Sequence, residues 1–307
     1  MHSRARTRLL AGALAIGIVA SLAGCGTSEA DPLNTGKGAQ ITVGAQGSVQ
    51  NRVIAQLYGQ VLAEHGYLVD YNEGIGARDA YIPALQAGTV DLVADNSGAL
   101  LYAANSNAFQ RLKDDVDDAL PKAVGEYGLH VLETAPADDA AAFVVTDEYA
   151  DQHQVASIGE LGYLAKNITI GAGADFENRR YGPAGLLSAY GLTGYATRTI
   201  IGDLPLVSDL LTGAVEVAVI PSTSPSIERN SLRVLADPKG LITAQNIVPL
   251  VNDAAYTDDV RALLDRVSEE LTTEELQALN ASSTETATPS PETIAKSWLT
   301  SKGLLVR

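Results

Sequence analysis

Cys25 is the side chain whose surroundings point most directly to a chemical role. It is the only cysteine among 307 residues and directly follows Leu22-Ala23-Gly24. Three arginines near the start of the chain precede an uncharged apolar run, residues 9–20, that is too short to span a bilayer. This order is typical of a bacterial lipoprotein signal, in which cleavage before the cysteine leaves its thiol free to carry lipid.

The signal predicts how the protein is held in the cell envelope. We expect residues 1–24 to be removed and residues 25–38, rich in small polar residues, to form a flexible tether. Acyl chains such as palmitate on Cys25 would anchor the protein to the outer face of the cytoplasmic membrane. An ordinary secretory signal with a chance cysteine is the alternative. In both cases the functional part works outside the cytoplasm.

Other chemically capable residues lack the spacing that catalysis or metal binding requires. The adjacent acids Asp138 and Asp139 are better explained as solvated side chains than as a catalytic pair, and residues 171–174 lack the remainder of a phosphate-binding loop. The histidines are scattered without ligand spacing, at His2, His65, His130 and His153. We therefore predict no metal, no cofactor and no catalytic activity.

Composition limits the classes of partner. The formal charge is −16, and loss of residues 1–24 removes three arginines and no acid, which moves it to −19. Such a surface repels nucleic acid and anionic membrane faces, so membrane contact is expected only through the lipid. No apolar stretch after Cys25 has membrane-spanning length, and about 280 residues suffice for two lobes of ordinary size. We expect a monomer.

Alternating β-prone and amphipathic stretches predict two β/α units. In the first unit, we expect strands over residues 41–45, 67–72 and 90–93, and helices over residues 53–62 and 79–87 that end at Gly66 and Gly88. In the second, we expect strands over residues 142–145, 168–171, 215–220 and 232–235, helices around residues 186–190 and 204–211, and a helix start at the capping box Ser157-Ile158-Gly159-Glu160.

The C-terminal part is predicted to return to the first unit. It reads as a strand over 247–251, a helix over 258–271, a helix capped by Thr272, an exposed loop over 282–291 and a last helix over 292–301. The expected class is α/β, with lobe 1 formed by residues 39–137 and 237–307 and lobe 2 by residues 138–236. Two crossings near residues 136–140 and 235–238 would join the lobes.

Ligands of open α/β sheets bind at the carboxyl ends of the strands, which directs attention to the polar residues that follow those strands. Asp95, Asn96 and Ser97 follow one predicted strand, and Ser222, Thr223 and Ser224 follow another. The first three residues are also good helix caps, and the second three are also typical of a turn. Both interpretations stay open at this point.

Motifs distributed over residues 40–307 resemble the substrate-binding proteins of osmoprotectant ABC importers, which carry glycine betaine, choline, carnitine and related solutes. The motifs are Ile41-Thr42-Val43-Gly44, Gly76-Ala77-Arg78-Asp79, Gly88-Thr89-Val90-Asp91-Leu92, Phe176-Glu177-Asn178-Arg179, Tyr190-Gly191-Leu192, Gly213-Ala214-Val215-Glu216 and Asn246-Ile247-Val248-Pro249-Leu250. The resemblance implies a two-lobed, type II periplasmic-binding-protein fold of the Venus-flytrap kind that delivers one solute to an ABC permease. It also implies a cage of aromatic rings around a quaternary ammonium and an arginine for the solute carboxylate.

The sequence departs from the family where that cage should lie. Asn96, Ala141, Pro221 and Gln245 stand where the family places aromatic residues, whereas Arg179 matches the family arginine and Gln46 matches a residue of the first loop. The candidate ligand-binding set is Gln46, Asp95, Asn96, Ser97, Asp139, Arg179, Ser222, Thr223, Ser224 and Gln245. We expect poor binding of glycine betaine and choline compared with a polar solute that carries an anion or several hydroxyls.

The sequence thus predicts a lipid-anchored, extracytoplasmic solute-binding component of an ABC importer. The alternative is a lipoprotein of the same fold that binds a different ligand or a protein partner without transport. A cell-envelope enzyme is a third, weaker hypothesis, because fold alone does not decide function.

Overall fold

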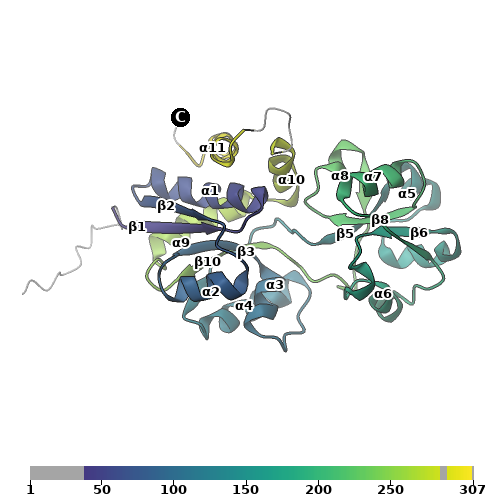
Figure 1. Ribbon diagram of the computed structural model, residues 1–307, viewed down its shortest axis with the longest axis horizontal. Helices are drawn as coiled ribbons and strands as arrows, with labels where there is room; N and C mark the ends of the chain where they lie inside the picture. Colours follow the sequence, from purple (N-terminus) through teal and green to yellow (C-terminus); the bar gives the residue numbers. More distant parts are fainter. Residues whose placement is uncertain (1–37, 284–288, 306–307) are drawn as a thin grey trace, which may run out of the picture. The chain divides into compact units, whose positions relative to one another are not determined.

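The computed structural model describes residues 38–283 and 289–305 (Figure 1). Cys25, the expected signal peptide and the tether up to residue 37 lie outside the described residues, as does part of the loop expected over 282–291. Within the described ranges, no helix combines the length and hydropathy needed to cross a bilayer.

The first sheet has the strand order β2-β1-β3-β10-β4. Its strands are β1 (Gln40–Ala45), β2 (Leu68–Glu73), β3 (Leu92–Asn96), β4 (Leu129–Val131) and β10 (Ile247–Asn252). β1 runs parallel to β2 and β3, as the sequence predicts, with Val43 opposite both Tyr71 and Leu92. β10 runs antiparallel to β3 and β4, so the sheet is mixed.

Helices cover both faces of this sheet (Figure 1). One face packs on α1 (Val49–Glu64), α9 (Asp258–Glu270), α10 (Thr273–Ser282) and α11 (Pro291–Ser301), and the other on α2 (Arg78–Gln86), α3 (Ser97–Ala104) and α4 (Lys113–Gly125). The side chain of Ser48 caps α1 by accepting from the Asn51 amide at 3.1 Å. Gly66, with φ of +96°, follows its C-terminus as predicted, because an L side chain is strained in that conformation.

The second sheet has the order β7-β6-β8-β5-β9 and is also mixed. β6 is parallel to β7 and β8, whereas β5 is antiparallel to β8 and β9. The strands are β5 (Ala141–Thr146), β6 (Thr169–Ala172), β7 (Ala196–Thr199), β8 (Val217–Pro221) and β9 (Leu232–Val234), and the α-helices are α5 (Asp147–His153), α6 (Pro183–Tyr190), α7 (Asp203–Leu211) and α8 (Ser226–Arg229). The capping box at Ser157 and Glu160 is present, but it opens a 3₁₀ helix, Ile158–Tyr163.

Two crossings connect the units, from β4 to β5 and from β9 to β10, and they pair with each other. The Asp139 amide donates to the Gln245 carbonyl at 3.1 Å, the Ile247 amide donates to the Ala137 carbonyl at 2.9 Å, and Asp138 and Asn246 form an antiparallel bridge. The crossings are therefore held side by side where the chain passes between the two sheets.

Candidate ligand-binding site

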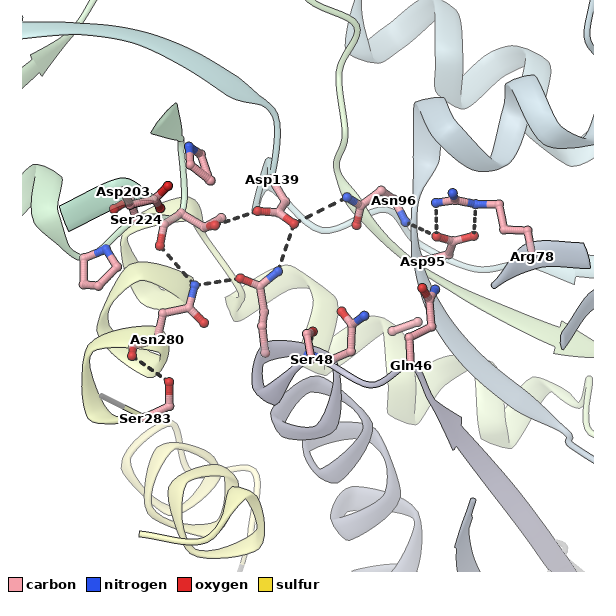
Figure 2. A pocket seen from close by; sticks show the side chains of 16 residues that line it. Gln46, Ser48, Arg78, Asp95, Asn96, Asp139, Asp203, Ser224, Asn280 and Ser283 are labelled. Carbon is pink, nitrogen blue, oxygen red and sulfur yellow. Dashed lines mark hydrogen bonds and ion pairs between the residues drawn. The ribbon is translucent and has the colours of Figure 1, made fainter. Parts of the chain in front are cut away.

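A cavity of about 440 Å³ lies at the carboxyl ends of β1, β3 and β8 (Figure 2). We call it the polar chamber. Side chains from both sheet units and from the first crossing line it. They are Gln46, Ser48, Gln50, Asn51, Arg78, Ala94, Asp95, Asn96, Asp139, Asp203, Pro221, Thr223, Ser224, Pro225, Asn280 and Ser283. No aromatic side chain is in this set, so the chamber has no wall suited to a quaternary ammonium.

Asp139 is the centre of a hydrogen-bond network in this chamber (Figure 2). Its carboxylate accepts from Thr223 Oγ1 at 2.6 Å, from Gln50 Nε2 at 2.9 Å and from Asn96 Nδ2 at 3.4 Å. Asn280 Nδ2 donates to Gln50 Oε1 at 2.6 Å and to the Thr223 carbonyl at 3.0 Å. Because a carboxylate only accepts, these amides and this hydroxyl are oriented by it, and none of them is a cation.

Arg78, the one basic side chain among the described residues that line the chamber, is already paired. Its Nε and a terminal nitrogen donate to Asp95 at 2.9 and 2.5 Å, and the Tyr81 hydroxyl and the Asn96 amide donate to the same carboxylate. Burial opposes the charge of Arg78, but the hydrogen bond and charge of Asp95 outweigh it and raise the pKa of Arg78. Burial, reinforced by Asp95, raises the pKa of Tyr81. The Arg78–Asp95 pair therefore adds no net charge.

Asp203 brings a second unpaired carboxylate to the chamber. It is the first residue of α7 and follows Gly202, whose φ of +92° suits glycine. Partial removal of water raises the pKa of Asp203, and within the described part of the chain it has no hydrogen-bond or ion-pair partner. Asp139 and Asp203 thus leave the polar chamber with an excess of negative charge.

Asp138 has a different role from its neighbour Asp139. Its carboxylate accepts from the Gln245 amide at 2.7 Å and so supports the pairing of the two crossings. Burial, and to a smaller extent the charge of Asp139, raises the pKa of Asp138. The two acids do not form a shared site, and among the described residues no group of three His, Cys, Asp or Glu side chains is arranged to hold a metal.

A second cavity, of about 320 Å³, shares three lining residues with the polar chamber: Asp139, Asp203 and Pro221. We call it the apolar chamber after six side chains of the second sheet unit in its lining, Phe176, Tyr181, Ile200, Leu206, Val219 and Ile220; the Asp175 carboxylate also lines it. The rings of Phe176 and Tyr181 lie 6.3 Å apart, centroid to centroid. The two chambers therefore adjoin at the carboxylates of Asp139 and Asp203.

Six of the ten candidate residues from the sequence line the polar chamber: Gln46, Asp95, Asn96, Asp139, Thr223 and Ser224. The other four do not. Ser97 is fully buried, Ser222 Oγ donates to the Asp138 carbonyl at 2.5 Å, and Gln245 Oε1 caps α3 by accepting from the Ala99 amide at 3.1 Å. Arg179 is exposed and forms an ion pair with Asp175. The ligand role of all ten stays a prediction.

Sequence reasoning overlooked several residues of this site. Ser48, Gln50 and Asn51 follow β1 closely, so the strand-end rule that directed attention to Asp95, Asn96 and Ser97 would have found them if applied after the first strand. Asp203 follows β7, a strand that the sequence did not reveal. Asn280 lies near the end of α10, far from any strand end, so the strand-end rule does not reach it.

The comparisons with known proteins identify the family. Residues 39–301 match the model of the substrate-binding domain of ABC-type glycine betaine transport systems. The chain belongs to this family. The match covers most of the sequence and confirms the resemblance that the motifs indicated. The family consists of substrate-binding domains of transport systems.

Solved structures confirm the type II periplasmic-binding-protein fold. A glycine betaine/carnitine/choline ABC transporter protein is 17% identical, with a TM-score of 0.80 over 87% of this chain and 99% of its own. Apo YehZ from Escherichia coli is 21% identical, with a TM-score of 0.74 over 86% and 99%. Lactococcal OpuAC, solved closed with glycine betaine, is 18% identical, with a TM-score of 0.52 over 86% and 96%. Because the sequence identities are only 17–21%, these similarities show a shared fold and nothing about the bound solute.

Proposed function

We propose that this member of the glycine betaine family is the extracytoplasmic solute-binding component of an osmoprotectant-type ABC importer. In this proposal it captures one small polar solute in the polar chamber, hands it to the permease and catalyses no reaction. The observation that carries the proposal is the make-up of the chamber, because Gln50 and Asn96 from one unit, Asp139 from a crossing and Thr223 from the other unit meet there in one network. A solute bound among them would contact both units at once.

The proposed lobes are residues 39–137 with 237–307, and residues 138–236. A solute that contacts both lobes stabilises the closed state by its differential affinity for that state, with the change in backbone angles concentrated in the crossings. The paired backbone of the crossings, such as the 3.1 Å bond from Asp139 to Gln245, supports a hinge that bends without separating the two segments. We propose that the protein acts as a monomer.

The proposed anchor is a lipidated Cys25, followed by a tether up to residue 38. Each buried CH₂ of an acyl chain contributes about 0.8 kcal/mol of membrane affinity, so two or three chains hold a protein firmly at a membrane surface. This would keep the solute-binding part on the outer face of the cytoplasmic membrane, within reach of a permease.

Solute binding followed by uptake tests the proposal. A thermal-shift screen of the full chain against osmolytes, amines, polyols and carboxylates identifies a ligand, since a solute at 100 times its Kd adds about 2.7 kcal/mol of stability. Uptake of that labelled solute is then compared in cells with and without the gene. We expect uptake to fall in the deletion strain and to recover on complementation. Binding with unchanged uptake would contradict transport and favour a binding protein that does not deliver its ligand to a permease.

A further inference from the structure

We infer that the ligand is a cationic amine that retains N–H bonds and carries an apolar group, with the amine at Asp139 and Asp203 and the apolar group in the apolar chamber. This inference rests on the proposed solute-binding function and specifies its ligand. The inferred ligand differs from a quaternary ammonium ion, which has no N–H to donate, and from the anionic solute that the sequence led us to expect.

Two acidic side chains lie where the two chambers adjoin. The polar chamber of about 440 Å³ and the apolar chamber of about 320 Å³ share Asp139, Asp203 and Pro221 in their linings. A ligand that occupies both would therefore pass the two carboxylates. Cavities of a few hundred Å³ that combine apolar side chains with a few fixed polar groups are typical for small organic ligands.

The charged side chains around the two chambers favour a cationic ligand over an anionic one. Asp139 accepts hydrogen bonds only from neutral amides and a hydroxyl, and Asp203 has no partner among the described residues. Arg78 is neutralised by Asp95 through two hydrogen bonds. Arg179, the expected anion ligand, is paired with Asp175 and lines neither chamber. Among the described side chains that line the two chambers, an anionic solute would thus meet two carboxylates without a cationic partner and no free cation.

The lining also selects N–H donors over methylated nitrogen. A carboxylate binds an ammonium most strongly through charge-assisted hydrogen bonds, which a trimethylammonium cannot form. A trimethylammonium is held instead by cation–π attraction to the face of an aromatic ring. None of the residues that line the polar chamber is aromatic. The aromatic side chains Phe176 and Tyr181 lie in the apolar chamber, together with aliphatic side chains such as Ile200 and Leu206, where they suit an apolar substituent.

Matched probes test this assignment. Binding of 2-phenylethylammonium to the full chain in neutral detergent is measured by calorimetry and compared with its N,N,N-trimethyl analogue, with uncharged 2-phenylethanol, with ethylammonium and with sorbitol. We expect 2-phenylethylammonium to bind at least tenfold more tightly than each of the others. Equal or tighter binding of the trimethyl analogue would contradict the requirement for N–H donors. Tighter binding of sorbitol or 2-phenylethanol would contradict the claim that the ligand is a cation. Absence of binding by the amine overturns the inference as a whole.

Variants connect the binding to the named side chains. Asp203→Asn removes a charge without breaking a hydrogen bond of the described structure. We expect this variant to bind 2-phenylethylammonium about tenfold more weakly and to bind 2-phenylethanol with unchanged affinity. Asp139→Asn is a second test of the same kind. Asp118→Asn, on the exposed side of α4 and outside both chambers, is the control for net charge. An unchanged amine affinity in both Asp203→Asn and Asp139→Asn contradicts the assignment.

The apolar chamber is tested separately with Tyr181. Tyr181→Ala removes a ring from its wall, whereas Tyr181→Phe retains the ring and removes the hydroxyl. We expect the alanine variant to lose most of the advantage of 2-phenylethylammonium over ethylammonium and the phenylalanine variant to keep it. The same loss in both variants, or in neither, overturns the placement of the apolar group. The uptake assay of the proposed function does not depend on this ranking, so the two can fail independently.

Discussion

Asn280 Nδ2 donates a hydrogen bond of 3.0 Å to the backbone carbonyl of Thr223, which joins helix α10 to the segment after β8 of the second sheet. The same amide donates to Gln50 Oε1 at 2.6 Å. Asn280 therefore links a helix of the first sheet unit to the network around Asp139 and to the second unit.

Replacing Asn280 by Ala is expected to lower the free energy of unfolding by about 1–3 kcal/mol, because two partly buried hydrogen bonds are lost and their acceptors remain. Urea denaturation of the full chain measures it. Ser282→Ala, which removes a hydroxyl bonded only to the Ala278 carbonyl on the exposed side of the same helix, is the control and should change stability by less than about 0.5 kcal/mol. Equal effects of the two substitutions would show that Asn280 has no special linking role.

Arg78→Met is expected to destabilise the protein by about 3 kcal/mol, because it leaves the Asp95 carboxylate, only 2% exposed, without its cation. Adding Asp95→Asn should recover a large part of this loss, since the buried charge is then removed as well. Arg261→Met, from the exposed Arg261–Asp258 pair, is the control and should be nearly neutral. A double variant as unstable as Arg78→Met alone would contradict the stated cause.

Glu275 is expected to contribute to acid sensitivity. Burial opposes its charge, but hydrogen bonds from Lys302 Nζ at 2.6 Å and Trp298 Nε1 at 2.7 Å outweigh burial and lower the pKa of Glu275. A carboxyl group with a lowered pKa in the folded state stabilises the protein above its unfolded pKa, and this stabilisation is lost as the pH falls below about 4.3. Glu275→Gln should therefore flatten the dependence of stability on pH in that acid range, measured by urea denaturation at several pH values. An unchanged slope would show that Glu275 is not responsible.

Cys25→Ser tests the anchor. We expect loss of labelling by a radioactive or clickable fatty acid and release or misprocessing of the protein, because serine provides no thiol for the acyl chain. Fractionation of membranes with parallel labelling measures both effects. A serine variant that is still labelled and membrane-bound would rule out Cys25 as the lipid attachment site.

The parts of the fold predicted from the sequence are those with a local signal. The stripe of apolar residues in α1 and the glycine at its end, Gly66, specified that helix almost completely. The strand expected over 90–93 is shifted to Leu92–Asn96, because Asp91 accepts from the Thr42 amide at 2.8 Å and pairing with β1 starts only at Leu92. β7 was missed, since all four of its residues are exposed and show no alternation.

The remaining features depend on contacts that periodicity does not encode. A strand pattern is the same in both directions, so the antiparallel orientation of β10 and β5 was not predictable. Gln245 was a ligand candidate, but it caps α3 instead. The cause is the close approach of the second crossing to Gly98, where a Cβ would lie 2.3 Å from the Ala244 carbonyl oxygen. Arg179 matched a family position, but its pairing with Asp175 was not predicted.

Calorimetric titration of the full chain with glycine betaine, choline and carnitine tests most directly the claim that this chain binds its solute without an aromatic cage. The polar chamber lacks three or four ring contacts worth about 0.5–2 kcal/mol each, so we expect no binding tighter than about 1 mM under conditions in which 2-phenylethylammonium binds. Asp203→Asn should weaken the binding of the amine about tenfold and create no binding of the betaines. Micromolar binding of any of the three methylated solutes would contradict the account, because other aromatic side chains would then have to close around the ligand.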